Sequence, residues 1–260
     1  MLTLLMVFRK AAADRRAGQR AEKGRADMGM TKAERLERQK ARLAEMKERE
    51  AELHAAGYRN IAGVDEVGRG PLAGPVVAAA VVLPDDFDAL GVDDSKKLSE
   101  KKREELYDVI MEKAVAYGIG MADHDVIDEM NILQATKQAM RQAISGLDAM
   151  LESRSARSGG DAAGIAGGID YVLFDAVEIE DIDIPQESVI KGDAKILCIA
   201  AASIVAKVTR DRMMVGYAQE FPGYGFEKNK GYGTRQHYEG IDSRGICPIH
   251  RKTFLKKYFE

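Results

Sequence analysis

The sequence predicts an α/β domain in which a β-sheet is covered by helices. Short apolar segments rich in β-branched residues alternate with segments of helical character, which is the pattern of such a domain. The composition, 45% hydrophobic and 31% charged, is that of a globular protein. At 260 residues the chain has room for one large domain or for one domain with appendages.

The first 58 residues predict a charged extension that is helical or disordered. Residues 1–30 are rich in Ala, Arg and Gly without a hydrophobic period, which is typical of disordered or weakly helical chain. Residues 31–56 are dense in Glu, Arg and Lys, and their thin apolar stripe predicts an exposed helix. A change of composition at Gly57 marks the end of this extension.

Residues 59–220 predict the main domain, and residues 221–260 a small, partly helical C-terminal segment with a short helix near 234–239. Residues 154–168 are rich in Gly, Ala and Ser, which predicts a loop or mobile insertion. In chain order, the main domain is expected to contain strands at 60–67 and 76–83, a helix from the Ser99 cap to about residue 113, a strand at 115–121, a helix at 123–150 broken near Asn131, strands at 171–174 and 188–190, and a helix at 195–220.

Charge is distributed unevenly along the chain. The overall net charge is −3, but residues 1–60 carry +6, residues 61–185 carry −14 and residues 186–260 carry +5. An acidic centre suits metal binding and basic flanks suit a polyanion, although solvated charged faces would give the same counts.

No apolar run approaches the roughly 18 residues that cross a membrane, and the short apolar N-terminus lacks the leading positive charge of a signal peptide. Cys198 and Cys247 do not form a disulfide framework, so a cytoplasmic, reducing location fits. A monomer is expected, and the sequence identifies no protein partner.

Acidic residues occur within or just after three apolar strand segments. Asp65 and Glu66 are adjacent inside the first, Asp175 ends the segment at 171–174, and Asp193 follows another. Buried carboxylates are costly unless a cation compensates them, and an oxygen-only ligand set without Cys or His favours Mg²⁺ or Mn²⁺ over Zn²⁺. Any one acid alone could equally be a helix cap, turn or surface ion pair. In a regular strand, moreover, Asp65 and Glu66 would point to opposite faces.

The glycine-rich residues 68–74 follow the first strand, as a dinucleotide-binding turn would. That motif requires a helix next, whereas Pro71, Pro75 and the β-branched run after them predict a second strand. Gly68 and Gly70 instead allow the backbone around Arg69 to approach a phosphate or a ribose 2′-hydroxyl.

Five runs of sequence resemble the bacterial ribonuclease HII family, the type 2 ribonucleases H. In order from about residue 60 to the C-terminus, over about three quarters of the chain, they are DEVGRGPLAGPVVAAAV at 65–81, DDSKKLS at 93–99, VIKGDAK with the following IAAASIVAKVTRD within 189–211, FPGYGFEKNKGYGT at 221–234, and HRKTF at 250–254.

The resemblance implies a ribonuclease H-like mixed sheet flanked by helices, with a small helical C-terminal segment. It implies an Mg²⁺- or Mn²⁺-dependent endonuclease that uses two metal ions. Its substrates would be RNA–DNA hybrids and single ribonucleotides in duplex DNA, as in ribonucleotide excision repair. Cleavage would fall 5′ to the ribonucleotide and leave 3′-hydroxyl and 5′-phosphate ends.

The same resemblance implies roles for particular residues. The four acids would be catalytic metal ligands, although many members have Asp-Gly where this chain has Asp175-Ala176. Residues Gly68, Arg69 and Gly70 would sense the 2′-hydroxyl. Tyr232 would stack on the sugar at the RNA–DNA junction, the alternative being a half-buried surface tyrosine. The basic residues in or beside the motifs are expected to contact phosphates: Lys96, Lys97, Lys191, Lys207, Arg210 and Lys230.

Two alternatives stay open at this point. Ribonuclease HIII is a sister type, but its loop usually reads Gly-Lys-Gly and it carries a folded N-terminal domain, whereas Arg69 stands in Gly-Arg-Gly here. A catalytically silent hybrid-binding module is the other, and four acids argue against it because a pure binder gains nothing from repelling phosphates.

Overall fold

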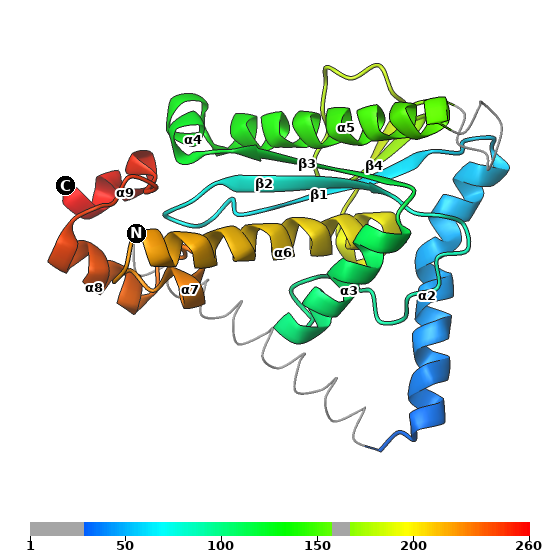
Figure 1. Cartoon of the computed structure of the whole chain (residues 1–260), viewed down its shortest axis with the longest axis horizontal. Coiled ribbons are helices and arrows are strands. Elements are labelled where there is room, and N and C mark those ends of the chain that lie inside the picture. The colour runs from blue at the N-terminus through cyan, green and yellow to red at the C-terminus, as the bar shows by residue number, and fades with distance from the viewer. Residues whose placement is uncertain (1–28, 158–166) are drawn as a thin grey trace. The chain divides into compact units, whose positions relative to one another are not determined.

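The computed structural model describes residues 29–157 and 167–260 (Figure 1). The disorder expected for residues 1–28 and most of the insertion predicted at 154–168 lie outside this description. Contacts divide the chain into two units, residues 1–45 and 46–260. Helix α2 (Lys32–Ala55) begins in the first unit, where Thr31 and Glu34 form a reciprocal capping box. The helix predicted at 31–56 is confirmed, but it is not exposed along its whole length, because Met46, Glu50 and Leu53 are buried.

The second unit contains a five-stranded mixed sheet in the order β3-β2-β1-β4-β5. Strand β1 pairs antiparallel with β2 and parallel with β4, while β2–β3 is antiparallel and β4–β5 is parallel. The predicted fold class, a mixed sheet flanked by helices, is confirmed. The strands are β1 (Ile61–Val67), β2 (Val76–Val82), β3 (Ala116–Ala122), β4 (Tyr171–Asp175) and β5 (Gln186–Val189).

Helices α5 and α6 cover opposite faces of the sheet (Figure 1). Close approach to both helices depends on glycine: a Cβ on Gly118 in β3 would lie 1.9 Å from the Ala143 carbonyl oxygen of α5, and one on Gly63 in β1 would lie 2.2 Å from the Cys198 backbone of α6. The helices of this unit are α3 (Glu100–Lys113), α4 (His124–Met130), α5 (Ile132–Arg157), the 3-10 turn η1 (Gly192–Ala194), α6 (Leu197–Glu220), α7 (Phe226–Asn229), α8 (Arg235–Arg244) and α9 (Lys252–Phe259).

Local signals account for several helix ends. The Ser99 hydroxyl accepts a hydrogen bond from the Lys102 amide, so the predicted cap of α3 is confirmed. The predicted break near Asn131 is also confirmed, since Asn131 has a φ of 78° and its side chain accepts from the first amides of α5. Helix α6 lacks a side-chain cap at Ile196, and Glu50 of α2 accepts a hydrogen bond from the Cys198 amide instead.

Two expectations about element bounds were wrong. Helix α5 runs on to Arg157, into the predicted insertion. Strand β5 ends at Val189, and Ile190 is exposed beyond it. The small helical C-terminal segment is confirmed, and it holds α7 and α9 in addition to the expected helix, which is α8. None of the helices in the described residues is both long and apolar enough to cross a bilayer.

Two loops of the second unit lie against each other. Residues 68–75, which we call the glycine loop, connect β1 to β2. Residues 230–234, which we call the tyrosine loop, connect α7 to α8. The Leu72 amide of the glycine loop donates a hydrogen bond to the Gly231 carbonyl of the tyrosine loop at 2.8 Å. Two segments about 160 residues apart in the sequence are therefore in direct contact.

Candidate active site

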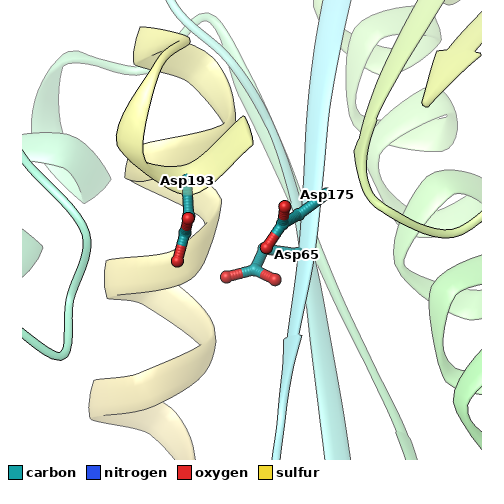
Figure 2. Close-up of side chains that lie close together, drawn as sticks. All are labelled: Asp65, Asp175 and Asp193. Atoms are coloured by element: carbon teal, nitrogen blue, oxygen red, sulfur yellow. The ribbon is translucent and has the colours of Figure 1, made fainter. Parts of the chain in front are cut away.

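Three aspartates from separate parts of the sequence come together at one edge of the sheet. Carboxylate oxygens of Asp65, Asp175 and Asp193 all lie within 4.8 Å of one another (Figure 2). Asp65 lies in β1, Asp175 is the last residue of β4, and Asp193 lies in η1. Three oxygen ligands at this spacing could hold a divalent cation.

The sheet register brings the first two of these aspartates together. Strands β1 and β4 are parallel neighbours in which Val64 pairs with Phe174, so the next residues, Asp65 and Asp175, stand side by side. The Gly192 amide donates to Asp175 Oδ1 at 2.8 Å. This hydrogen bond ties η1, and with it Asp193, to the end of β4.

Burial makes the cluster electrostatically unfavourable without a cation. Asp65 is 3% exposed and Asp193 is 5% exposed. Burial, and then the neighbouring Glu66 carboxylate, raise the pKa of Asp65 well above its ordinary value, although a hydrogen bond from Ser203 opposes the shift. Burial likewise raises the pKa of Asp193 against the opposing charge of Lys96. A bound divalent ion would remove this penalty.

Lys96 lies beside the acids. Its Nζ is 3.2 Å from Asp193 Oδ2. Burial acts to lower the pKa of Lys96, but the carboxylates of Asp65 and Asp193 outweigh it, so the net shift is upward. The side chain expected to contact phosphate therefore ion-pairs with a candidate ligand in this structure, although more than half of it is exposed to solvent.

Glu66 lies next to the group of three but is not part of it. Strand β1 stays regular through both acids, with Asp65 opposite Ala79 and Glu66 opposite Ala78, so the two side chains leave opposite faces. Arg69 Nη1 lies 3.4 Å from Glu66 Oε1. The other oxygen, Oε2, is buried and has no hydrogen-bond partner in the described part of the chain. An unsatisfied buried carboxylate oxygen is costly, and a cation ligand would satisfy it.

The glycine loop and Tyr232 are adjacent, as their predicted joint role requires. A Cβ built on Gly70 would lie 3.6 Å from Cε1 of the Tyr232 ring. Tyr232 is 44% exposed, and Arg69 and Gly70 are exposed as well. Gly68 has a φ of 95°, and a Cβ there would lie 2.3 Å from Arg210 Nε. The loop thus presents open backbone beside an accessible aromatic ring.

The other predicted phosphate contacts have different surroundings. Lys191 is exposed, whereas Lys230 donates to the Glu227 carbonyl and Lys207 pairs with Asp211 at 2.5 Å. The expectation that Arg210 grips phosphate was wrong. Arg210 is fully buried, and its guanidinium donates to backbone carbonyls.

Sequence reasoning missed residues that hold the two loops in place. Arg251 is fully buried and donates to carbonyls of the glycine loop. His237 and His250 form a buried pair beneath the tyrosine loop. Arg251 and His250 stand in the HRKTF motif, so the signal was present. Only the tertiary contacts reveal what these side chains do.

Comparisons with known proteins agree with these motifs. The family model described as Ribonuclease HII matches residues 62–259. Ribonuclease HII of Enterococcus faecalis is 55% identical over 210 residues, 81% of this chain and 75% of the relative. Ribonuclease HII of Ligilactobacillus salivarius is 55% identical over 205 residues, 79% of this chain and 73% of the relative. The crystal structure of ribonuclease H2 from Pyrococcus horikoshii is similar with a TM-score of 0.55 and 26% identity, over 75% of this chain and 93% of that one.

Proposed function

The chain belongs to the ribonuclease HII family, and from this premise we propose that it cleaves DNA duplexes on the 5′ side of an embedded ribonucleotide. As a family member it is a ribonuclease H, a metal-binding hydrolase that cuts the RNA of RNA–DNA hybrids internally. Our proposal adds the single-ribonucleotide substrate, the 3′-hydroxyl and 5′-phosphate products, and a role in ribonucleotide excision repair. The cytoplasmic location stays a prediction.

The observation that carries the proposal is the group of three aspartates, of which Asp65 and Asp193 are buried, beside the unsatisfied oxygen of Glu66. We propose that Asp65, Asp175, Asp193 and Glu66 hold Mn²⁺ or Mg²⁺. These four side chains offer only hard oxygen ligands, which such ions prefer. Two such ions, when bound, would activate a water molecule and stabilise the leaving oxygen of the phosphodiester.

The protein's own residues would place the substrate against this centre. The exposed Gly70 leaves the loop backbone open to a ribose, and the exposed Arg69 guanidinium is available to a phosphate or the 2′-hydroxyl. Gly68 is buried and lets the loop pack closely against Arg210. The accessible Tyr232 ring next to Gly70 suits stacking on a sugar. Lys191 and Lys230 would add salt-dependent affinity for the backbone.

The test is cleavage of a labelled DNA duplex that contains one ribonucleotide, with Mn²⁺ or Mg²⁺ and with EDTA as the control. A ligation assay on the products would identify the 3′-hydroxyl and 5′-phosphate ends. Cleavage of a continuous hybrid but not of the single-ribonucleotide duplex would refute the proposed substrate. Binding without metal-dependent turnover would support the silent binding module instead.

A further inference from the structure

One buried arginine connects the two loops that flank the candidate active site. Arg210 on α6 is fully buried. Its Nε donates to the Pro75 carbonyl at 2.8 Å and its Nη2 to the Ala73 carbonyl at 3.1 Å, both in the glycine loop. Its Nη1 donates to the Lys230 carbonyl at 2.9 Å, in the tyrosine loop. A single planar group therefore joins two segments far apart in the sequence, in addition to the direct Leu72–Gly231 backbone hydrogen bond between them.

The chemistry of this contact is unusual for a buried charge. The hydrogen-bond acceptors of Arg210 are neutral backbone carbonyls. Burial lowers the pKa of Arg210 to about 10, so the group is still charged at neutral pH. Desolvation of a buried cation offsets much of what its hydrogen bonds contribute to stability. The Arg210 guanidinium instead fixes the geometry of the loops, because its rigid fork binds several acceptors at fixed angles.

The surrounding packing transmits this geometry to Tyr232. Gly231, the residue before Tyr232, has no room for a side chain, since a Cβ there would lie 2.5 Å from the Ala73 oxygen. Arg251 bridges the two ends of the glycine loop, because it donates to the carbonyls of Gly68 and Arg69 at the start and of Gly74 near the end. The glycine loop is thus held at both ends, and the tyrosine loop is held to it through Arg210 and through the Leu72–Gly231 hydrogen bond.

We propose that Arg210 is a positioning residue that sets the place of Tyr232 relative to the glycine loop, and thereby the recognition of the junction between ribonucleotide and deoxyribonucleotide. The inference rests on the proposed function, in which the glycine loop reads the 2′-hydroxyl while Tyr232 stacks on the sugar beside it. Both contacts are possible at once only if the two loops keep a fixed spacing. Lysine at position 210 would keep the charge but lose the three-way geometry.

A double-mutant cycle between Arg210→Lys and Tyr232→Ala tests this. On the single-ribonucleotide duplex, Arg210→Lys should lower kcat/KM about tenfold alone, but less than about twofold in the Tyr232→Ala background, because its effect passes through Tyr232. An equal loss in both backgrounds would overturn the proposal, since a merely structural role would act independently of Tyr232. Arg212→Lys is the matched control, because Arg212 on the same helix is exposed and pairs with Glu104, and it should leave the rate unchanged.

A fluorescence measurement separates this proposal from the proposed function. The chain has no tryptophan, so Tyr232→Trp gives a single reporter in the tyrosine loop. Adding Arg210→Lys should lower its anisotropy and raise its quenching by acrylamide, whether or not the protein cleaves the duplex. Unchanged anisotropy would count against the positioning role. If Arg210→Lys does not fold, Arg210→Gln takes its place, because a glutamine side chain likewise cannot donate to all three carbonyls.

Discussion

The Nε2 atoms of His237 and His250 lie 3.0 Å apart, and both rings are fully buried. The hydrogen-bond partners of the two rings indicate which ring nitrogens carry a proton. His237 Nδ1 lies 3.0 Å from the Tyr232 carbonyl and must donate to it. His250 Nδ1 lies 2.9 Å from the Cys247 amide and 3.1 Å from the Cys247 carbonyl, and we assign it as the acceptor of the shorter contact because the amide can only donate. Hence His250 donates through Nε2 to His237, and both rings are neutral. This chain of hydrogen bonds ends at the backbone carbonyl of Tyr232 and holds it in place.

Acid should therefore destabilise the protein through this pair. Burial lowers the pKa of His250 to about 4 and also lowers that of His237. A folded-state pKa below the unfolded value of about 6.5 means that the stabilisation is complete above that value and is lost as pH falls toward 4. His250 alone corresponds to about 3 kcal/mol over this range.

Urea unfolding at a series of pH values checks the prediction. His250→Gln keeps a donor toward His237 but cannot titrate, so its stability should fall less steeply between pH 6.5 and 4 than that of the parent protein. Parallel pH profiles for the two proteins would contradict the neutral pair. His54→Gln is the control, because His54 is only partly buried and lies outside this network.

Asp65→Asn should abolish activity and yet stabilise the metal-free protein. Asp65 carries a raised pKa because it is buried beside Glu66, so its charge opposes folding at neutral pH. Removing that charge should add about 1–3 kcal/mol to the free energy of unfolding in EDTA. Turnover should fall by orders of magnitude while duplex binding is largely kept.

Thermal denaturation with and without Mn²⁺ tests whether the ion binds at the site that contains Asp65. Binding of the ion to the folded protein should increase the free energy of unfolding by RT ln(1 + [Mn²⁺]/Kd) and thereby raise the Tm of the parent protein. The increase in Tm should be much smaller for Asp65→Asn. An equal metal-induced shift in both proteins would place the ion elsewhere.

Most of the fold and the acidic site could be predicted because each depends on local patterns. Alternation of apolar strands with helices gave the α/β class, and acids at strand ends gave Asp65, Asp175 and Asp193. Parallel pairing of β1 with β4 then brings two of them together. Asp193 is brought to the other two by the η1 turn. The hydrogen bond from the Gly192 amide to Asp175 that holds this turn is a tertiary contact, which local patterns do not reveal.

The residues that escaped prediction act through backbone carbonyls or across long sequence distances. An arginine in a basic motif was expected to contact phosphate, but Arg210 faces inward because three carbonyls of two loops meet at that point. Glu50 looks like any glutamate of a charged helix, and its partner, the Cys198 amide, is in another element. Periodicity reports which face of a helix is apolar, but it does not report what packs against that face.

From the position of Glu50 we expect that part of α2 is needed for a stable domain, although α2 precedes the residues 62–259 that the family model matches. Its carboxylate caps α6 through the Cys198 amide at 2.9 Å, and burial raises its pKa to about 7. A raised pKa means that this stabilisation is present at low pH and is lost as pH rises through about 7. Glu50→Gln keeps an oxygen acceptor without a charge.

At pH 8.5 Glu50→Gln should therefore be more stable than the parent protein by about 1 kcal/mol, whereas Glu50→Ala should be less stable by about 1–2 kcal/mol because the cap is lost. Urea titrations at pH 6 and 8.5 test both signs. Glu52→Gln is the matched control, since Glu52 is exposed and pairs with Arg49 on the same helix. Equal stability of Glu50→Gln and Glu52→Gln at pH 8.5 would mean that the charge of Glu50 does not oppose folding. Unchanged stability of Glu50→Ala would mean that Glu50 is not a cap.

The last prediction concerns the packing of α5 on β3, where Gly118 of the strand and Gly146 of the helix lie close together. A Cβ on Gly118 would lie 1.9 Å from the Ala143 carbonyl oxygen, a backbone atom that cannot move without shifting the helix. Gly118→Ala should therefore lower the free energy of unfolding by about 3 kcal/mol or more. Gly146 lies inside α5, and a Cβ there would meet the Gly118 Cα at an ordinary 3.7 Å. Gly146→Ala should raise stability by about 0.5–1 kcal/mol, because alanine favours the helix. Chemical denaturation of both variants measures the contrast, and a similar sign for the two would mean that α5 does not approach β3 this closely.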